Sequence, residues 1–279
     1  MTSLRTAVAA AATRLDAAGV PSPWFDAEEL AALSLRVDRG ELWRHDAPGP
    51  GFERYVERRA GREPLQHITG RAYFRHLTLS VGPGVFVPRP ETEIVAGAAI
   101  EAARAAGSAD GRAVVVVDLG TGSGAIALAV ADEVPAASVH AVEADPAAHA
   151  WARKNCAGTA VLLRSGDMAD AFRDLDGTVD IVVSNPPYIP LGAHIRDAEV
   201  AVHDPVTALW SGPDGLDAIG VVEEVAARLL RPGGLVVVEH ADLQGRTAPD
   251  VFRRAGRWRD TEDHPDLAGR DRYLTAVRG

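Results

Sequence analysis

The segment that most constrains the fold is an apolar run that stops at two consecutive prolines. Residues 179–183 are apolar apart from Asp180, and Ser184-Asn185-Pro186-Pro187-Tyr188 follows directly. A short run of this kind is typical of a buried parallel strand. Because proline cannot continue a hydrogen-bonded ladder, the chain must leave the sheet here in an extended turn. In open α/β sheets, ligands bind at this carboxyl end of the strands.

Further apolar runs alternate with helical patterns in the second part of the chain. The helical patterns lie between predicted strands at residues 114–117, 138–142, 160–163, 235–239 and 272–277. This alternation predicts an α/β fold, a doubly wound and mostly parallel sheet of the Rossmann-like type.

The first part of the chain has a different pattern. Residues 1–75 have helical periodicity and predict a small N-terminal helical domain. Two short runs of β-type pattern then flank Gly82-Pro83-Gly84, which predicts a β-hairpin with its turn at these three residues. We therefore expect a helical domain at 1–75, a hairpin connector at 76–88 and a sheet domain at 89–279.

A glycine-rich loop follows the predicted strand at 114–117. The loop, Gly120-Thr121-Gly122-Ser123-Gly124, leads into an apolar helix. Glycines let the backbone approach a ligand closely, and a helix N-terminus offers unpaired N–H groups. Glu143 ends the next strand, about 20 residues on, where an acid commonly binds ribose hydroxyls. The loop alone leaves an NAD-type site, an S-adenosylmethionine-type site and a plain tight turn open.

The Asn185-Pro186-Pro187-Tyr188 turn decides between these cofactors. An asparagine side-chain oxygen and a proline carbonyl can accept both hydrogens of a planar NH2 group, and Tyr188 can wall the same pocket. This sequence is the signature of methyltransferases that act on amino nitrogens of planar groups. Because it has no role in hydride transfer, it favours S-adenosylmethionine. The alternative is a proline-rich turn without chemistry.

Bulk properties restrict the remaining function classes. The net charge of −10 and pI near 5.4 argue against broad affinity for nucleic acid. The single cysteine, Cys156, suits a reducing cytoplasm, and residues 1–20 resemble neither a signal peptide nor a membrane span. The nine histidines do not pair at metal-ligand spacing, so no metal site is expected.

Several motifs along the chain resemble the PrmC/HemK family of bacterial release-factor glutamine methyltransferases. They occur in the family's order, and the second separates this family from other enzymes that carry Asn-Pro-Pro-Tyr. The motifs are Pro64-Leu65-Gln66-His67-Ile68, Val85-Phe86-Val87-Pro88-Arg89-Pro90-Glu91-Thr92-Glu93, Asp118-Leu119-Gly120-Thr121-Gly122-Ser123-Gly124, Ser184-Asn185-Pro186-Pro187-Tyr188 and Asp266-Leu267-Ala268-Gly269-Arg270.

The resemblance implies a class I S-adenosylmethionine-dependent methyltransferase that modifies the side-chain nitrogen (N5) of the Gly-Gly-Gln glutamine in class-one peptide-chain release factors. S-adenosylhomocysteine is then the product, and the release factor is the partner of a helical domain that recognises it. Membrane or direct nucleic-acid binding is not expected.

The resemblance also assigns site residues. Implied cofactor contacts are Gly120, Thr121, Gly122, Ser123, Gly124, Glu143 (where the family usually has Asp), Met168 against adenine, and Asn185. Catalytic roles fall to Asn185, Pro186 and Tyr188, and substrate binding to the same residues with Pro187. We further expect Phe86 to enclose the glutamine, and Arg89 either to bind the substrate backbone or to pair with Glu91 or Glu93.

Three rival functions remain from the sequence. An N6-adenine methyltransferase of nucleic acid would use the same planar-NH2 site, although the acidic balance argues against it. A glutamine methyltransferase with another protein substrate would share all the motifs. A binding protein without activity would retain only the cofactor fold.

Overall fold

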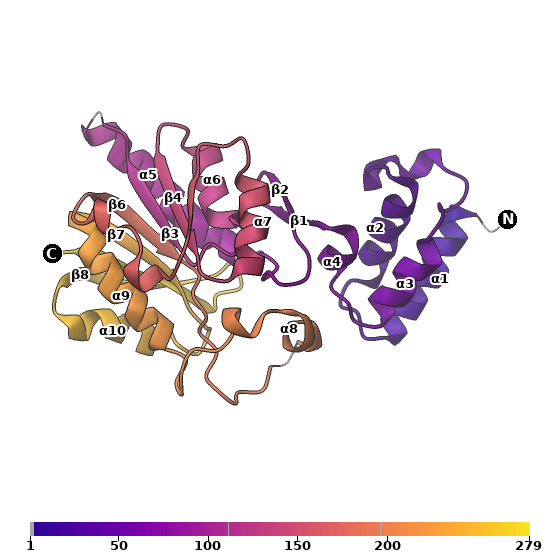
Figure 1. Ribbon diagram of the computed structural model, residues 1–279. Helices are drawn as coiled ribbons and strands as arrows, with labels where there is room; N and C mark the ends of the chain where they lie inside the picture. Colours follow the sequence, from indigo (N-terminus) through magenta and orange to yellow (C-terminus); the bar gives the residue numbers. More distant parts are fainter. Residues whose placement is uncertain (1–2, 111, 196) are drawn as a thin grey trace. The chain divides into compact units, whose positions relative to one another are not determined.

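The computed structural model describes residues 3–110, 112–195 and 197–279 (Figure 1). The chain forms two compact units. The helical unit comprises Met1–Arg71, Val81–Pro83 and Ile195–His203, and the sheet unit comprises Ala72–Ser80, Gly84–His194 and Asp204–Gly279. The first segment of the helical unit ends at Arg71, four residues before the boundary expected at 75. The unit also includes a short segment from late in the chain, Ile195–His203.

The helical unit is a bundle around a small aliphatic core. Leu15, Leu30 and Val56 lie at its centre with no exposed surface. Its elements are α1 (Leu4–Ala17), α2 (Pro23–Leu35), the 3-10 helix η1 (Arg39–Arg44), α3 (Phe52–Ala60), α4 (Leu65–Thr69) and α8 (Ala198–His203). Figure 1 labels the five α-helices among them.

Helix α8 joins this unit through a buried ion-pair cluster. Arg59 is 3% exposed; its Nε donates to Asp26 at 2.7 Å and its Nη1 to Glu199 of α8 at 2.8 Å. Arg62 adds a second contact to Glu199 at 3.0 Å. Nothing local in the sequence around Glu199 indicated this attachment, because its partners lie 140 and 137 positions earlier.

Among the described residues of the sheet unit, seven strands form one sheet in the order β5-β4-β3-β6-β7-β9-β8. Strands β5, β4, β3, β6 and β7 are parallel, and β9 is antiparallel to both β7 and β8. The expected mostly parallel, doubly wound sheet is confirmed. The strands are β3 (Val115–Leu119), β4 (Ser138–Glu143), β5 (Leu162–Ser165), β6 (Val179–Ser184), β7 (Leu230–Glu239), β8 (Trp258–Pro265) and β9 (Asp271–Arg278).

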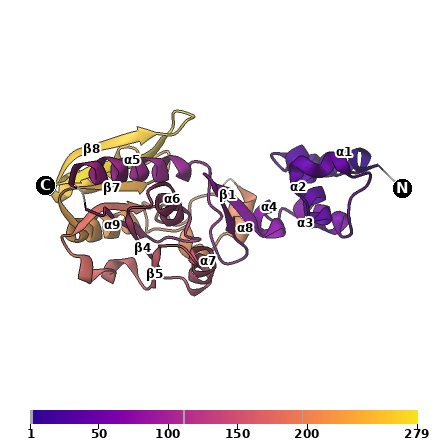
Figure 2. The same ribbon diagram turned by 90° about the horizontal axis from the view of Figure 1, so that it is seen from above.

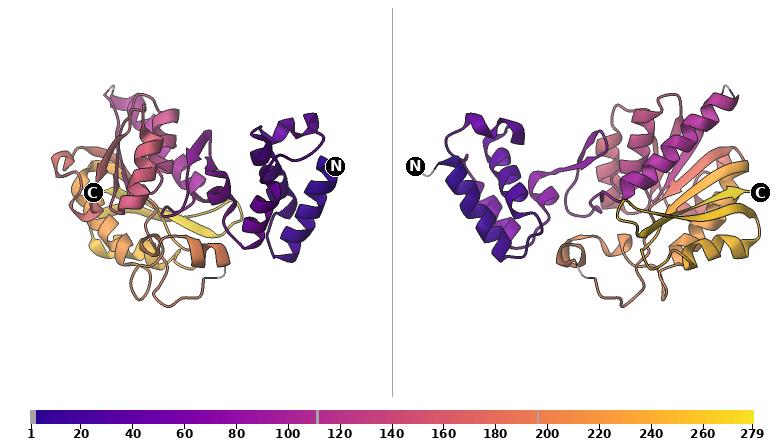
Figure 3. Two further views of the ribbon diagram at one scale, coloured as in Figure 1. Left: turned by 45° about the vertical axis from the view of Figure 1, so that its right-hand side comes forward. Right: turned by 180° about the vertical axis from the view of Figure 1, so that it is seen from behind.

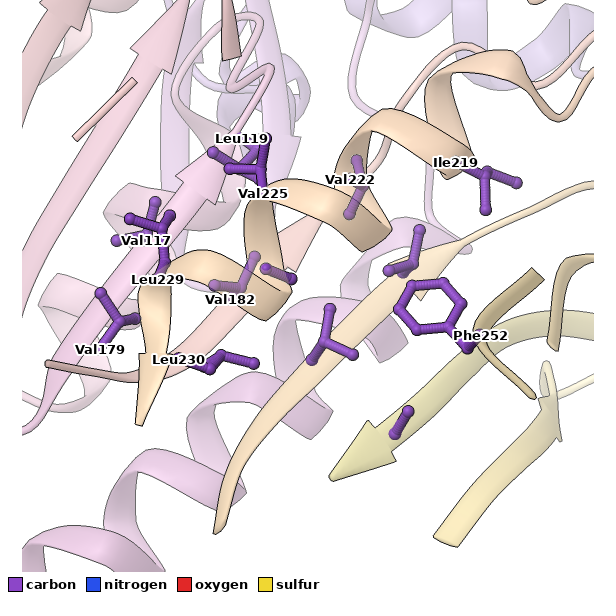
Figure 4. Packing of buried hydrophobic residues seen from close by; sticks show 14 of the residues in the cluster. Val117, Leu119, Val179, Val182, Ile219, Val222, Val225, Leu229, Leu230 and Phe252 are labelled. Carbon is purple, nitrogen blue, oxygen red and sulfur yellow. The ribbon is translucent and has the colours of Figure 1, made fainter. Parts of the chain in front are cut away.

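Helices cover both faces of the sheet. The long helix α5 runs across one face (Figure 3), and α5 and α9 lie on opposite sides of β7 (Figure 2). Phe252 of α10 packs with α9 residues and strand valines in the core of the second face (Figure 4). The remaining elements are α5 (Thr92–Asp110), α6 (Ala125–Glu133), α7 (Pro146–Cys156), η2 (Met168–Asp170), η3 (Arg173–Leu175), η4 (Val206–Ala208), α9 (Asp217–Leu229) and α10 (Thr247–Ala255).

The predicted hairpin exists, but its position was wrong. Strands β1 (Arg71–Phe74) and β2 (Leu77–Ser80) form the two-stranded sheet, so the turn falls at Arg75-His76 and not at Gly82-Pro83-Gly84. Arg75 takes the positive φ of 52° that the turn requires, a conformation that sequence patterns assign to glycine.

None of the helices in the described ranges is long and apolar enough to cross a bilayer.

Candidate active site

The expected ligand site lies where β3 and β6 run side by side at the centre of the sheet. From β3 the chain moves outward to β4 and β5, whereas β6 starts the opposite half. Such a switch point opens a crevice at the carboxyl ends of the strands. The two strand ends are joined there, because Leu119 pairs in register with Ser184 and the Ser184 hydroxyl donates to the Leu119 carbonyl at 2.7 Å.

The glycine loop leaves β3 with three left-handed residues. Gly120, Gly122 and Gly124 have φ values of 69°, 59° and 88°. A Cβ at Gly124 would lie 3.3 Å from Leu128, so this glycine serves packing of the loop on helix α6. A Cβ at Gly120 or Gly122 would meet no protein atom within 4 Å. The space beside these two glycines is therefore free of protein atoms, as close approach of a ligand to the backbone would require.

Asp118 at the end of β3 supports the loop from beneath. Its Oδ2 accepts hydrogen bonds from the Thr121 hydroxyl at 2.5 Å and from the Ala127 N–H at 3.1 Å. Its Oδ1 is buried without a hydrogen-bond partner among the described residues. Burial raises the pKa of this carboxyl to about 7. The sequence motifs assign Asp118 no role, although it stands in the Asp-Leu-Gly stretch.

Glu143 contacts the loop from the end of β4. Its carboxylate accepts the Gly122 N–H and the Asp145 N–H, each at 2.8 Å, and burial raises its pKa. Met168 lies half-buried beyond β5 and packs against the hydrophobic core of the second sheet face. Acidic acceptors beside open glycine backbone suit a cofactor with ribose hydroxyls and a positively charged amino acid part.

The Asn185-Pro186-Pro187-Tyr188 turn is held from several sides. The Asn185 Nδ2 donates to the Thr92 hydroxyl at 3.1 Å, and the Tyr188 hydroxyl donates to Glu239 at 3.2 Å. Gln244 Nε2 donates to the Tyr188 carbonyl at 3.1 Å. No described residue donates to Asn185 Oδ1 or to the Pro186 carbonyl. Two acceptors of the turn are therefore open to a donor pair.

The segment before α5 is fixed differently from the expectation. The Arg89 guanidinium lies 5.0 Å from the centre of the Phe86 ring, and its Nη2 pairs with Asp204 at 2.7 Å. The expected pairing of Arg89 with Glu91 or Glu93 was therefore wrong, because the buried Asp204 carboxylate lies within reach. The enclosing role of Phe86 stays a prediction.

Together, the sheet order, the glycine loop at the switch point and the Asn-Pro-Pro-Tyr turn beside it define a class I methyltransferase. A solved methyltransferase from Pyrococcus furiosus shares this fold with a TM-score of 0.50 at 20% identity, over 72% of this chain and 88% of that one.

Comparison with known families narrows this class. The "Methyltransferase small domain" model matches residues 83–203 and the "PrmC N-terminal domain" model matches residues 6–70. A release factor glutamine methyltransferase of Streptomyces coelicolor is 58% identical over 99% of this chain and 98% of its own length. One of Mycolicibacterium smegmatis is 50% identical over 100% and 99%. The chain belongs to the release factor glutamine methyltransferase family.

One relative carries a different name. A 4-amino-L-phenylalanine/4-methylamino-L-phenylalanine methyltransferase of Streptomyces pristinaespiralis is 44% identical over 91% of this chain and 87% of its own length. Its named substrate is an amine on a planar ring.

Proposed function

We propose that the chain transfers a methyl group from S-adenosylmethionine to the side-chain N5 of the Gly-Gly-Gln glutamine in class-one peptide-chain release factors, leaving S-adenosylhomocysteine. The carrying observation is the pair of open acceptors, Asn185 Oδ1 and the Pro186 carbonyl, which suits a carboxamide NH2. Full-length relatives named for this reaction support the choice of substrate. Its place of action is the cytoplasm, where release factors work.

The acceptor pair addresses the chemical difficulty of the reaction. A carboxamide nitrogen is a poor nucleophile because its lone pair is delocalised into the carbonyl. Accepting both N–H hydrogens, at Asn185 and Pro186, increases electron density on the nitrogen and fixes its direction. S-adenosylmethionine supplies, when bound, an electrophilic methyl carbon on a sulfonium. Orientation alone can contribute about 7–11 kcal/mol to such a reaction.

The remaining assignments follow from the same site. The proton leaves after methyl transfer, when the nitrogen is acidic, so we assign neither a general base nor a metal. In this proposal residues 120–124 hold the methionine part of the cofactor, Glu143 the ribose and Met168 the adenine, while Tyr188, Pro187 and Phe86 enclose the glutamine. Asp118 Oδ1, buried and unpaired, is a further acceptor on the cofactor side.

Mass spectrometry of a purified class-one release factor incubated with the chain and S-adenosylmethionine tests this function. We expect one added methyl on the Gly-Gly-Gln glutamine, and none on a release factor whose glutamine is replaced by glutamate. Asn185→Ala should lower the rate about 10²- to 10³-fold, the effect of losing one preorganised hydrogen-bonding group. If the release factor stayed unmodified while the chain still bound S-adenosylhomocysteine, the proposal that release factors are the substrate would be refuted.

The same assay separates the rival substrates. Methylation of free 4-amino-L-phenylalanine at a rate above that of the release factor would assign the chain to the activity named for its Streptomyces pristinaespiralis relative. Methyl incorporation into DNA would favour the adenine methyltransferase. Methylation of a different protein in a cell extract lacking class-one release factors would favour another protein substrate.

We assign recognition of the release factor body to the helical unit. Trp24, Phe25 and Trp43 are 49%, 40% and 78% exposed there, and the Arg39 and Arg44 guanidinium groups lie over the Phe25 and Trp43 rings. Exposed tryptophan with arginine is the composition of protein-binding hot spots. We expect Trp43→Ala to raise KM for the whole release factor and not for a Gly-Gly-Gln peptide. Tyr73→Ala, which removes an aromatic ring that is 58% exposed in the sheet unit, is the control.

A further inference from the structure

Gln244 lies in the loop between β7 and α10 and contacts the last residue of the Asn-Pro-Pro-Tyr turn. It is 6% exposed, and its Nε2 donates to the Tyr188 carbonyl at 3.1 Å. The proposed function assigns it no part, and none of the sequence motifs includes it. Because a buried carboxamide must have its donors and acceptors satisfied, its hydrogen bonds show which segments it holds together.

The orientation of the Gln244 carboxamide is determined by its neighbours. Its Oε1 accepts the Ala241 N–H at 3.0 Å, and a backbone N–H can only donate, so the oxygen end lies on this side. Its Nε2 faces three carbonyl oxygens, those of Tyr188 at 3.1 Å, Asp214 at 3.2 Å and Gly215 at 3.3 Å. A carboxamide turned by 180° would place its oxygen against three acceptors. The side chain therefore cross-links two loops and the turn in one orientation.

The Asn-Pro-Pro-Tyr turn depends on donors from outside itself. Pro186 and Pro187 have no N–H, so two of its four residues cannot hold it in place by backbone donation. Hydrogen bonds to its carbonyl groups must supply this support instead. Among the described residues, Gln244 is the one group that donates to the Tyr188 carbonyl.

Gly215 brings a second backbone segment directly against the same carbonyl group. It takes a positive φ of 79°, and a Cβ at this position would lie 2.3 Å from the Tyr188 oxygen and 2.8 Å from Gln244 Nε2. Both distances are too short for any side chain, so the position requires glycine. The Tyr188 carbonyl is thus confined between the Gly215 backbone and the Gln244 carboxamide.

The chain beyond the turn continues this attachment. The Ile189 N–H donates to the Leu209 carbonyl at 2.9 Å, and the Ile189 carbonyl accepts the Ser211 N–H at 2.9 Å. These two bonds form an isolated parallel bridge between Ile189 and Trp210. Gln244 therefore acts at the point where the turn ends and this bridge begins.

We propose that Gln244 is a positioning residue that fixes the Tyr188 peptide, and with it the Tyr188 ring and the Pro186 carbonyl, toward the NH2 group of the substrate. The ring is held at its far end as well, because its hydroxyl donates to Glu239 at 3.2 Å. Both the backbone and the side chain of this tyrosine are therefore fixed. The inference deepens the proposed function and rests on it for the identity of the substrate only.

Gln244→Glu tests this role by kinetics. The variant keeps the oxygen that the Ala241 N–H requires but replaces the NH2 group by an acceptor that faces three carbonyls. We expect kcat for methylation to fall by up to about 10²-fold, the effect of a misplaced reacting group. The Kd for S-adenosylhomocysteine, measured by calorimetry, should stay at its native value. Gln244→Asn keeps the carboxamide but is one methylene shorter; it should show the same split, and it replaces Gln244→Glu if that variant does not fold.

Glu223→Gln is the matched control for a loss of stability. Glu223 is 4% exposed and pairs with Arg257 Nη2 at 2.6 Å. Arg257 directly precedes Trp258, which pairs with Arg278 on the amino-end side of β7, away from the turn. This control should lower the free energy of unfolding and leave kcat unchanged. Equal kcat in Gln244→Glu and Glu223→Gln, or a kcat loss accompanied by an equal rise in the Kd for S-adenosylhomocysteine, would overturn the positioning role.

A spectroscopic test needs no substrate. Tyr188-Ile189 is the single Tyr-Ile pair of the chain, so carbonyl ¹³C-tyrosine with ¹⁵N-isoleucine gives one carbonyl-coupled amide signal, that of Ile189. Because this amide donates to the Leu209 carbonyl, it should exchange slowly with D2O in the native chain. Gln244→Glu should accelerate its exchange by about 10-fold relative to Glu223→Gln, because the turn has lost a hydrogen bond that held it.

The exchange measurement separates this inference from the proposed function. Faster exchange of the Ile189 amide in Gln244→Glu upholds the positioning role even if the release factor stays unmodified. Equal exchange in Gln244→Glu and Glu223→Gln rejects it even if release factor methylation is confirmed.

Discussion

Replacing Arg59 by leucine removes the cation from the most buried ion-pair cluster of the helical unit. The side chains of Arg59, Asp26 and Glu199 are 4%, 6% and 14% exposed. Loss of the guanidinium leaves two carboxylates facing a site with little water, and breaking a buried pair in this way costs about 3–5 kcal/mol. Arg62 still contacts Glu199 at 3.0 Å. Most of the lost stability should therefore come from the Asp26 carboxylate, which is left without its cation.

The cost should depend on pH with a defined sign. Burial raises the pKa of Asp26 above 3.8, and the Arg59 hydrogen bond opposes that shift. Without Arg59 the folded-state pKa rises further, so the folded variant takes up a proton that the unfolded chain does not hold. The variant should therefore regain stability as the pH falls from 7 through its folded-state pKa, until the unfolded chain is protonated as well.

Urea unfolding of the full chain at pH 7 and pH 5, followed by helix circular dichroism, measures both effects. Arg14→Leu is the matched control, because Arg14 pairs with Glu53 at 2.8 Å while their side chains are 49% and 77% exposed. An exposed pair contributes at most about 1 kcal/mol. If Arg59→Leu cost no more than Arg14→Leu, or lost stability on acidification, the reasoning from burial would be refuted.

Four further predictions concern the glycine loop, Glu143 and the buried Cys156. Gly122→Ala places a Cβ in space free of protein atoms at φ 59°, so we expect a loss of about 1–2 kcal/mol in unfolding free energy and a larger Kd for S-adenosylhomocysteine by calorimetry. Glu143→Ala leaves the Gly122 and Asp145 N–H groups without their acceptor and should raise the same Kd about 10-fold or more, whereas an unchanged Kd would contradict its ribose role. In the native chain the Kd should also rise on acidification at a higher pH than an exposed glutamate would give, because burial raises the pKa of Glu143. Burial raises the pKa of Cys156 to about 11, so a disulfide reagent at pH 8 should label it at least about 100-fold more slowly in the folded chain than in urea.

Patterns within the sequence were sufficient for the central elements. The apolar run before Asn185 and the glycines after residue 119 predicted β6, β3 and their loops, because buried parallel strands and glycine turns are specified locally. β8 was missed: Trp258–Pro265 is mostly polar, and it pairs with β9 alone at the edge of the sheet. An edge strand does not need a continuous apolar run.

The support of the site was less predictable than the site itself. Thr92 belongs to a motif, but nothing in that motif indicated that its hydroxyl would accept a hydrogen bond from Asn185. Only the register of β6 against β7 brings Glu239 to the same edge as Asn185. The contact of Glu199 with Arg59 was not predictable either. It forms because the chain comes back to the helical unit late in the sequence, and no local sequence pattern indicates this. Long-range pairing of polar side chains depends on strand order and register, which single-sequence periodicity does not specify.

The return of α8 to the helical unit has a consequence for biosynthesis. Arg59 and Asp26 leave the ribosome before Glu199, which follows Arg59 by 140 positions. At about 5–20 residues per second, the helical unit waits about 7–28 s for its last ion-pair partner. The segment made first is thus completed only after β6 and the Asn185 turn have been translated, so maturation of the two units is linked in time by the connectivity of the chain.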